Sequence, residues 1–457
     1  MKVALFVHCF FPSHFYGTEK YTLDLARNLR ALGHEPVVVT AVFPGEPAQA
    51  DLLHRYEFEG IAVISIDKNR LPNTRVKDTY YQPEMAPVLD ALLDEIDPAV
   101  VHVTHLINHT AVLLEVLARR GLPVVATFTD FFGFCYTNKL EAHDGSLCAG
   151  PASPAVNCLA CHLKEGAQRS STRRAAIARR PAGAASLARA MHAWQRTPGM
   201  RAGRIAGLVQ DLVQRPLTLM SLYRAYHHAI VPTAFIRQAY ERNGYAGRMT
   251  NIPFGVDLSR VEKQGRADGR LVLGFVGQIM AHKGPDMLIE AARRTLDPAA
   301  YEIRIMGSLS QDSEYGARLE RLAQGLPVRF LGTFPQESMR GVLDDIDALV
   351  IPSRWYENSP LVLLNALASH TPVIVSDVAG MTEFVEQGVN GFAFERGSVE
   401  GLAAVLQRIA ANPQLLRAMV ATTHYDMTTA SMTERTIEVY EHAIADARAA
   451  AVERRRA

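Results

Sequence analysis

The chain has 457 residues, of which 48% are hydrophobic and 21% are charged, and its formal net charge is +1. This composition excludes an intrinsically disordered chain, and at roughly 150 residues per domain the length predicts two to three domains. No uninterrupted apolar run approaches the ~18 residues that a membrane span needs. Residues 1–8 turn polar too soon for a secretory signal, so we expect a cytoplasmic protein.

The positive charge is concentrated in one segment, residues 162–224. This segment holds twelve Lys or Arg residues against Glu165 and Asp211, so its net charge is +10 and the rest of the chain is at −9. The basic residues are Lys164, Arg169, Arg173, Arg174, Arg179, Arg180, Arg189, Arg196, Arg201, Arg204, Arg215 and Arg224. One local segment, rather than the whole protein, is therefore suited to meet anions.

Residues 1–130 alternate strand-like apolar runs with amphipathic helical windows, a pattern typical of parallel βα units. A first strand is expected over 2–11, followed by a helix whose apolar residues recur every three or four positions until Gly33. Those apolar residues are Tyr21, Leu25, Leu29 and Leu32. Further strands are expected over 37–42, 61–66, 100–103 and 124–128, with helices over 85–96 and 110–120. This alternation predicts a doubly wound sheet.

The same alternation restarts downstream. Strands are expected over 271–276, 301–306, 328–332, 348–352 and 372–376, with helices over 285–294, 315–322, 338–343 and 360–369. Pro and Gly punctuate residues 251–257, which predicts a hinge. The sequence therefore predicts an α/β protein with domains at 1–250 and 251–424, and a C-terminal helix within 425–457 that packs back on the first domain. Ligands of such sheets bind outside the carboxyl ends of the strands.

One loop of the second domain carries a lysine where an anion would bind. The strand over 271–276 runs into Gly277 and Gln278, and Lys283 follows near a helix N-terminus, where free amides and the helix dipole favour negative charge. One interpretation is a phosphate site. The other is an ordinary solvated lysine, because the loop matches no standard phosphate-binding motif.

A second loop follows the strand over 348–352. Glu357 lies on it, where site residues collect on α/β sheets. Ser359 is the expected N-cap of the next helix and Pro360 its expected first residue, because these residue types favour those positions. Asn365 lies one to two turns into that helix.

These segments together resemble the family 4 glycosyltransferases, retaining nucleotide-sugar enzymes with the GT-B fold of two Rossmann-like domains facing a central cleft. The matching segments are Gly17–Glu19, Gly255–Asp257, Gly277–Gly284, Glu357–Ala366 and Gly380–Glu383. Their order and spacing cover most of the chain outside residues 135–230. The resemblance implies transfer of a sugar from a nucleoside-diphosphate donor, such as a UDP-sugar, to a polysaccharide or lipid-linked glycan acceptor.

The resemblance also implies roles for individual residues. A Glu at the position of Glu357 contacts the donor sugar near the reacting carbon, and a Lys at the position of Lys283 binds the donor diphosphate. With Asp130, carried over on the acceptor side, these are the expected catalytic residues. The expected donor-binding residues are Gly17, Gly277, Gln278, Lys283, Asn358, Ser359, Pro360, Leu361 and Asn365.

The chain departs from the family pattern at two of these positions and at Tyr16. Asn365 stands where a second Glu normally holds the ribose hydroxyls, Gln278 where Arg is frequent, and Tyr16 where a glycine is usual. Asn lacks the charge that makes hydrogen bonds to a carboxylate roughly twice as strong. Two alternatives therefore stay open: a catalytically weak sugar-nucleotide-binding partner of another transferase, and a GT-B sugar-nucleotide epimerase.

Metal is not expected in the reaction itself, because Lys283 and backbone amides would stabilise the charge that develops on the departing diphosphate. A structural zinc ion is a separate expectation. Cys135, Cys148, Cys158 and Cys161 fall within 27 residues and close with a Cys-x2-Cys pair, as in tetrahedral zinc sites. Free thiols are the alternative, because the longer spacings are not those of a standard zinc finger.

Two amphipathic stripes follow the cysteines within the basic segment. They are formed by Leu187, Met191 and Trp194, and by Ile205, Leu208, Val209, Leu212 and Val213. Together with the charge of +10 they predict either contact with the anionic inner face of a membrane or a helical hairpin docked on the first domain. No nucleic-acid partner is expected, because the segment lacks interleaved aromatic residues and a recognition motif.

The N-terminal domain holds further residues of chemical interest. His102, His105 and His109 follow the fourth expected strand. No carboxylate partner is evident for them in the sequence, so we interpret them as packed or solvated histidines. Cys9, near the end of the first strand, is interpreted as a small core residue.

Overall fold

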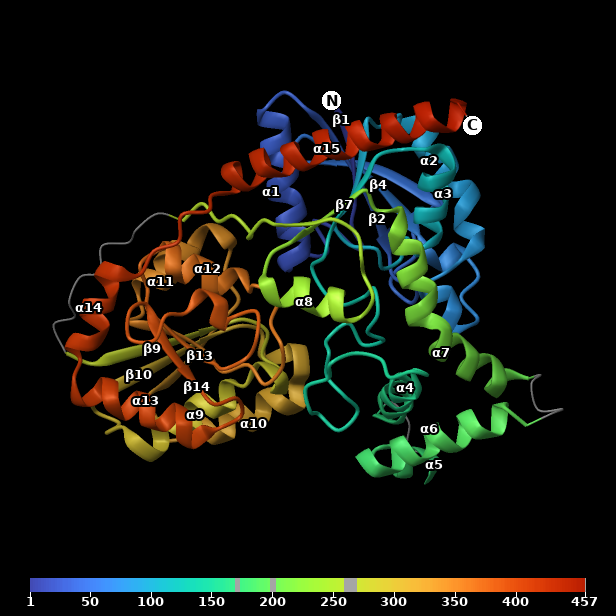
Figure 1. Cartoon of the computed structure of the whole chain (residues 1–457). Coiled ribbons are helices and arrows are strands. Elements are labelled where there is room, and N and C mark those ends of the chain that lie inside the picture. The colour runs from blue at the N-terminus through green and yellow to red at the C-terminus, as the bar shows by residue number, and fades with distance from the viewer. Residues whose placement is uncertain (169–172, 198–202, 259–268, 457) are drawn as a thin grey trace. The chain divides into compact units, whose positions relative to one another are not determined.

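The computed structural model describes residues 1–168, 173–197, 203–258 and 269–456. It divides into two compact units: unit 1 is Met1–Pro253 with Thr429–Ala457, and unit 2 is Phe254–Thr428. Each unit is built on one largely parallel sheet with helices packed on it (Figure 1), which confirms the predicted α/β class with two doubly wound sheets. Among the described helices, none combines the length and the apolar composition that crossing a membrane requires.

Unit 1 contains an eight-stranded sheet in the order β3-β4-β2-β1-β5-β6-β7-β8, parallel except for the β3–β4 pair. The strands are β1 (Lys2–Phe6), β2 (Glu35–Val42), β3 (Leu53–Phe58), β4 (Ile61–Asp67), β5 (Val100–Val103), β6 (Val124–Thr127), β7 (His228–Val231) and β8 (Met249–Asn251). The strand order reverses between β1 and β5. The carboxyl ends of these two strands therefore mark the ligand-binding edge of the unit.

The helices of unit 1 are α1 (Gly17–Ala31), α2 (Ala86–Ile96), α3 (Val112–Arg120), α4 (Val156–Gln168), α5 (Arg173–Ala178), α6 (Pro181–Gln195), α7 (Arg204–Leu222), α8 (Ala234–Arg242) and α15 (Thr429–Arg456). Helix α1 forms largely as predicted: Tyr21, Leu25 and Leu29 are buried, and Gly33 follows the helix with a φ of +79°. The expectation for Leu32 was wrong, because it lies at the C-cap and is 49% exposed. Helix α15 returns to unit 1 and lies alongside α1 (Figure 1), contacting also β5, β6 and β7.

Unit 2 contains a fully parallel six-stranded sheet in the order β11-β10-β9-β12-β13-β14, the order of a Rossmann sheet. The strands are β9 (Leu271–Val276), β10 (Tyr301–Met306), β11 (Val328–Gly332), β12 (Ala348–Ile351), β13 (Val373–Ser376) and β14 (Gly391–Phe394). The helices are α9 (Pro285–Thr295), α10 (Ser313–Ala323), α11 (Met339–Asp344), α12 (Leu361–Ala368), α13 (Val399–Ala411) and α14 (Gln414–Thr422). The order reverses between β9 and β12, so the loops after these strands form the ligand-binding edge.

Alternate residues of the unit 2 strands face two separate hydrophobic cores, because successive side chains of a strand point to opposite faces. Leu273 and Phe275 of β9 join the core beneath α9, α10 and α13. Val272 of the same strand joins the core beneath α11 and α12. Burial on both faces is why these strands appear in the sequence as continuous apolar runs rather than as an alternation.

Short 3-10 helices connect many of these elements. They are Lys68–Arg70, Val76–Thr79, Pro83–Met85, Tyr223–Ala225, Ala281–Lys283, Leu309–Asp312, Gln336–Ser338 and Thr382–Phe384.

The structure differs from the predicted elements mainly at edges and ends. The first strand ends at Phe6 rather than at residue 11. A strand that reached residue 11 would run into Pro12, whose backbone nitrogen has no hydrogen to donate to a neighbouring strand. Strands β3, β7, β8 and β14 were not predicted. Strand β3 is an edge strand in which polar residues interrupt the apolar ones and none is buried, and β8 has only three residues, so neither leaves an apolar run in the sequence.

His102 predicts an acid-dependent loss of stability. Burial lowers the pKa of His102 from 6.5 to about 3. Between these values the unfolded chain binds the additional proton, so the free energy of unfolding falls as the pH falls. From pH 6 to pH 4 this single group should lower the free energy of unfolding by about 2 to 3 kcal/mol, at ~1.4 kcal/mol per pKa unit. Denaturant titrations at pH 6 and pH 4 should therefore show a smaller loss of unfolding free energy in His102→Gln than in the wild type. Equal losses would contradict the assignment of this pH dependence to His102.

Candidate functional site

A partly buried ion pair joins the two loops at the ligand-binding edge of unit 2. Lys283 follows β9 and Glu357 follows β12, and the Lys283 Nζ lies 2.7 Å from the Glu357 Oε1. The indole N–H of Trp355 donates to the same oxygen at 3.1 Å, and the Lys283 ammonium lies 5.2 Å from the centre of the Trp355 ring. Glu357 is 6% exposed, whereas the Lys283 side chain is 22% exposed. The structure thus brings together the two residues that the sequence placed at the reaction.

Two glycines allow the loops to approach so closely. Gly380 has a φ of +87°, and a Cβ added there would lie 1.6 Å from the Glu357 carbonyl oxygen. Gly284 has a φ of +72°, and its added Cβ would lie 2.2 Å from the Pro352 carbonyl oxygen. At both positions the positive φ and the close contact exclude any residue with a side chain, because its Cβ would strain the backbone and displace the neighbouring loop. Gly380 therefore allows the loop after β13 to pack directly against the backbone of Glu357.

The start of α12 differs from the prediction. Ser359 has a φ of +60° and its hydroxyl caps nothing, while Pro360 takes the N-cap position in extended conformation and the helix begins at Leu361. The expectation that Ser359 is the N-cap and Pro360 the first helical residue was wrong. Ser359 is 2% exposed, and its buried Oγ makes no hydrogen bond to the described chain. A strained, buried hydroxyl of this kind is typical of a ligand site.

The other expected donor residues occupy the same edge, with one exception. Gly277 and Gln278 follow β9 directly, Asn358 lies on the loop after β12, and Asn365 is buried in α12 at 8% exposure. Gly17 instead begins α1 in unit 1, where a Cβ would meet open space. The structure therefore groups the donor residues of unit 2, and leaves Gly17 with the other unit.

Sequence reasoning missed the salt bridge that supports the Lys283 loop. Arg354 donates two parallel hydrogen bonds to Asp286, at 2.8 and 2.9 Å, and its backbone N–H donates to the His282 carbonyl at 2.8 Å. Burial alone would raise the pKa of Asp286, but the Arg354 guanidinium and the Tyr315 hydroxyl hold it below its usual range. Bidentate pairs of this kind fix geometry as well as adding energy. The only sequence signal was an acidic residue in the first turn of α9.

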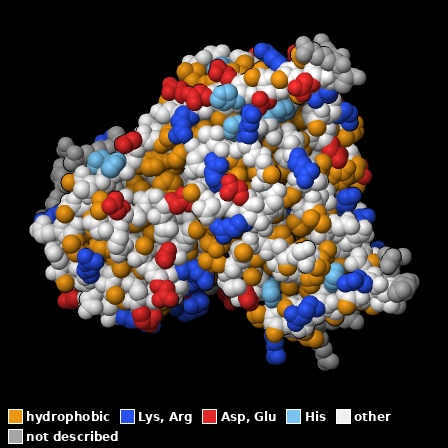
Figure 2. Space-filling view, in the orientation of Figure 1, with side chains coloured by type: hydrophobic (Ala, Val, Ile, Leu, Met, Phe, Trp, Pro, Cys, Tyr) orange, Lys and Arg blue, Asp and Glu red, His pale blue; other side chains and the backbone are white. Residues whose placement is uncertain are grey.

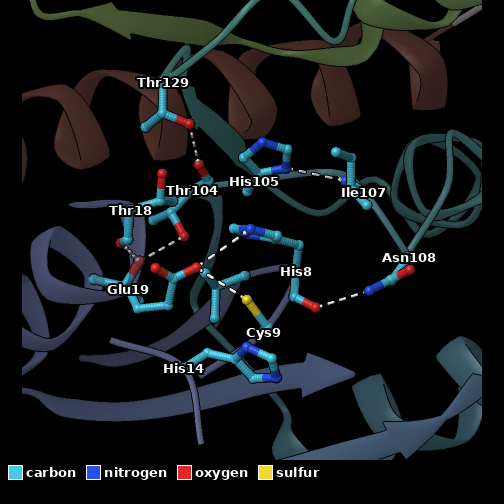
Figure 3. A network of polar contacts seen from close by, with 12 residues as sticks. His8, Cys9, His14, Thr18, Glu19, Thr104, His105, Ile107, Asn108 and Thr129 are labelled. Carbon is cyan, nitrogen blue, oxygen red and sulfur yellow. Dashed lines mark hydrogen bonds and ion pairs between the residues drawn. The ribbon is translucent and has the colours of Figure 1, made fainter. Parts of the chain in front are cut away.

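A second polar network lies at the ligand-binding edge of unit 1 (Figure 3). His105 Nε2 donates to the Asp130 Oδ2 at 2.9 Å. Its Nδ1 accepts from the Ile107 amide at 3.2 Å, the contact that Figure 3 draws. His105 is packed, as interpreted, and the structure supplies the carboxylate partner that was not evident in the sequence. Asp130 also accepts from the Phe132 amide at 2.8 Å. Asp130 is thus held in a fixed orientation after β6.

The other histidines of this region are packed, as interpreted. His102 Nδ1 and Nε2 lie within hydrogen-bond distance of the Tyr440 and Thr127 hydroxyls, and His109 donates to the Val7 carbonyl. Burial lowers the pKa of His109 to about 4. Neither side chain is exposed. Both serve the core of unit 1.

The four clustered cysteines lie near one another as free thiols. Burial, and then the neighbouring sulfur atoms, raise the pKa of Cys158 and of Cys161 to about 12. A zinc ion holds sulfur ligands about 3.8 Å apart in a tetrahedron. Within the described chain, no three of these sulfur atoms lie within 4.8 Å of one another. The cluster would have to contract to bind zinc, so the zinc site stays a prediction.

The basic segment forms helices α4 to α7, of which α4, α6 and α7 share a small core built from Leu159, Ala184, Ala188, Val209 and Leu212. Val76 and Tyr136 of unit 1 pack against that core, so the segment is docked on its own unit. Arg169, Arg201 and the side chains of Arg173 and Arg174 lie outside the described residues. Arg215 is buried and donates to the carbonyls of Phe132 and Cys135, so this one cation is structural.

The outer surface of this segment combines charge with apolar side chains. Ile177, Trp194, Ile205 and Leu217 are exposed, the last by 74%. Figure 2 shows Lys and Arg side chains among hydrophobic ones in the region where α4 to α6 lie in Figure 1. The predicted stripes are therefore divided: Val209 and Leu212 are buried inside, while Trp194 and Ile205 face outward.

The sequence models of two different families match the two units of the chain. The sequence model of the family described as "Glycosyltransferase Family 4" matches residues 15–143, and the model of "Glycosyl transferases group 1" matches residues 259–424. The first match contains Glu19, His105 and Asp130. The second contains Lys283 and Glu357.

Curated relatives match part of the chain. A D-inositol 3-phosphate glycosyltransferase of Geodermatophilus obscurus is 35% identical over 202 residues, which are 40% of this chain and 45% of the relative. A GDP-mannose-dependent alpha-(1-6)-phosphatidylinositol dimannoside mannosyltransferase of Mycobacterium tuberculosis is 28% identical over 41% of this chain and 50% of the relative. The chain spans about half the length of these relatives.

Solved structures match over nearly the whole chain. Sucrose-phosphate synthase from Thermosynechococcus elongatus has a TM-score of 0.62 at 17% identity, covering 97% of this chain and 99% of that one. HepE of Anabaena, solved with UDP and glucose, has a TM-score of 0.61 at 15% identity, covering 96% and 99%. At these identities the likeness concerns the fold. Together with the two family matches, it shows that the chain belongs with the family 4-like glycosyltransferases of the GT-B fold.

Proposed function

We propose that the chain transfers a sugar from a nucleoside-diphosphate donor to a polysaccharide or lipid-linked glycan acceptor, with retention of anomeric configuration. The observation that carries the proposal is the Lys283–Glu357 pair at the point where the unit 2 strand order reverses. Ligands of open α/β sheets bind at that point. A partly exposed ammonium group beside a buried carboxylate suits a ligand that carries both a diphosphate and a sugar.

Departure of the nucleoside diphosphate concentrates negative charge on its phosphate oxygens. Lys283 precedes the first residue of α9 by only two positions, and the dipole of that helix also favours negative charge at its N-terminus. Without donor, Lys283 is neutralised by Glu357. In the proposed complex the diphosphate would share the ammonium, and the Glu357 carboxylate would face the sugar near the reacting carbon. The chemistry then requires no metal at unit 2.

The residues that we propose for acceptor binding lie in unit 1. Asp130 is oriented by His105 and by the Phe132 amide at the ligand-binding edge of that sheet. The named relatives act on inositol phosphate or on phosphatidylinositol mannosides, which are polar or lipid-linked hydroxyl acceptors. An acceptor of that chemical class fits a carboxylate-histidine pair that can hold a hydroxyl group.

The rival function is binding of a sugar nucleotide without efficient transfer, as in a partner of another transferase. Asn365 favours it, because this buried amide replaces a carboxylate toward the ribose. A thermal-shift screen against UDP-, GDP- and dTDP-sugars, followed by assay of nucleoside-diphosphate release, separates the functions, since a ligand that binds only the folded state raises the melting temperature. Stabilisation with release that requires acceptor supports transfer. Stabilisation without release supports the rival, and an altered nucleotide sugar formed without acceptor supports an epimerase.

We propose in addition that the outer surface of α5 to α7 rests on an anionic membrane. Each Lys or Arg near such a surface contributes about 1 kcal/mol, and exposed Trp194 and Ile205 supply apolar contact. Flotation with phosphatidylglycerol vesicles should show salt-sensitive binding, weakened by about 2 kcal/mol or roughly 30-fold in Arg189→Ala/Arg196→Ala. The matched control is Arg293→Ala/Arg294→Ala on α9. Absence of binding by the wild type at low salt would reject the proposal.

A further inference from the structure

Three different metal-ligand groups meet at the carboxyl end of β1. They are the His8 imidazole, the Cys9 thiol and the Glu19 carboxylate, and Figure 3 shows the carboxylate between the other two side chains. One ligand atom of each lies within 4.8 Å of the others, the only such set of three or more His, Cys, Asp and Glu residues in the part of the chain that the structure describes. We propose that these three residues bind a divalent cation of the Zn²⁺ class.

The separations of the ligand atoms fit such an ion. The Glu19 Oε1 lies 3.0 Å from the Cys9 Sγ and 3.2 Å from the His8 Nε2. A tetrahedral zinc ion bound to nitrogen, oxygen and sulfur holds its ligand atoms about 3.3 to 3.6 Å apart. These two separations would widen by only a few tenths of an ångström, and the third, between the Cys9 sulfur and a His8 ring nitrogen, is within 4.8 Å. Nitrogen, oxygen and thiolate donors together favour zinc over magnesium or calcium, which prefer oxygen alone.

The burial of Glu19 is the second observation. This side chain is 1% exposed, and its Oε2 makes no hydrogen bond to any described residue. Its one described ion-pair partner is His8, and no described Lys or Arg lies within ion-pair distance of it. A buried carboxylate without a fixed cation is costly, because its charge loses hydration. A divalent cation would supply the missing charge, with the thiol proton released and the imidazole bound through Nε2 with its proton on Nδ1.

The neighbouring groups limit the ligand set to these three. Both nitrogens of His105 are engaged, with Asp130 and with the Ile107 amide, although its ring lies 4.2 Å from that of His8. His14 instead pairs with Glu46 at 3.2 Å. Three protein ligands leave a fourth position for water or an acceptor hydroxyl, as in open zinc sites. The position lies where the strand order of unit 1 reverses, which is where a ligand would reach it.

Metal content measured by mass spectrometry tests the proposal on the full chain, purified without chelator and dialysed against Zn²⁺. The comparison is between the wild type, His8→Gln, Cys9→Ser and Glu19→Gln, with His14→Gln as the matched control. The four distant cysteines are present in every protein, so any metal that they hold cancels in the difference. We expect each of the three variants, but not His14→Gln, to bind one equivalent less than the wild type. Equal contents in the wild type, Cys9→Ser and Glu19→Gln would overturn the site.

A second measurement covers variants that fold poorly. Adding Co²⁺ to metal-free wild-type protein should produce a thiolate-to-cobalt charge-transfer band, and His14→Gln should reproduce it. Circular dichroism identifies the variants that are folded, and among these Cys9→Ser should show a weaker band. If Cys9→Ser does not fold, the melting temperatures of the wild type and of Glu19→Gln decide: both keep the four other cysteines, and the rise on adding Zn²⁺ after chelation should be larger in the wild type, with no such rise on adding Mg²⁺. No difference between the two ions would also overturn the proposal.

Discussion

Replacing Lys283 by alanine is expected to slow sugar transfer by about 2 to 4 kcal/mol in activation free energy, or roughly 30- to 1,000-fold. The variant removes the ammonium group that would stabilise the departing diphosphate, and leaves the buried Glu357 carboxylate with the Trp355 indole as its remaining described donor. Release of nucleoside diphosphate, measured with the sugar nucleotide that stabilises the wild type most, gives the turnover. A loss in kcat larger than the change in KM indicates that the lysine acts in the transition state.

Two controls distinguish this role from a general effect on unit 2. Arg294→Ala removes an exposed cation of α9 that pairs with Glu290 and Glu400, and should leave turnover unchanged. Lys283→Arg keeps the charge and should retain part of the activity, because a guanidinium also binds phosphate. Wild-type turnover in Lys283→Ala would remove this residue from the mechanism.

Replacing Gly380 by alanine is expected to destabilise unit 2 by about 2 to 5 kcal/mol and to displace Glu357. A left-handed backbone costs a residue with a Cβ about 1 to 2 kcal/mol, and forcing an atom into packed space costs a further 1 to 3 kcal/mol or so, about the cost of overpacking a core. Both apply here, because φ is +87° and the added Cβ would lie 1.6 Å from the Glu357 carbonyl oxygen. Denaturant titration measures the loss, and a weakened thermal shift with sugar nucleotide reports the displaced carboxylate.

Gly388 provides the matched control for that variant. It has a φ of +81°, close to that of Gly380, but an added Cβ would meet nothing within 4 Å. Gly388→Ala should therefore show only the backbone cost of about 1 to 2 kcal/mol and bind sugar nucleotide normally. If Gly380→Ala and Gly388→Ala lose equal stability, then the close contact with the Glu357 carbonyl oxygen is not what restricts position 380 to glycine.

The unit 2 site was largely predictable because its residues belong to loops that follow strongly apolar strands. Strands β9 and β12 are buried on both faces, so the sequence marks where each ends, and parallel topology brings those ends to one edge. Lys283 and Glu357 were expected there, and they meet. The start of α12 was not predicted correctly. Ser359 has the residue type of an N-cap, but tertiary contacts of its loop place it at a φ of +60°.

The polar network of unit 1 was less predictable from the sequence than the Lys283–Glu357 pair. In the sequence, Glu19 appeared only as the last residue of the matching segment Gly17–Glu19, with nothing to predict its burial. Only the tertiary packing of α1 buries it beside His8 and Cys9, which follow β1. His105 and Asp130 are 25 residues apart and follow different strands, so their hydrogen bond depends on the pairing of β5 with β6.

The sequence by itself determined the α/β class, the two doubly wound sheets and the loops that carry Lys283 and Glu357, because hydrophobic periodicity and chain turns are local properties. Tertiary structure alone decided which polar groups are buried and what they face. The partners of Glu19, His105 and Asp286 come from other elements of the chain, and Ser359 is buried in a strained backbone conformation. Burial and electrostatic interaction depend on three-dimensional proximity, and no local pattern of residues records it.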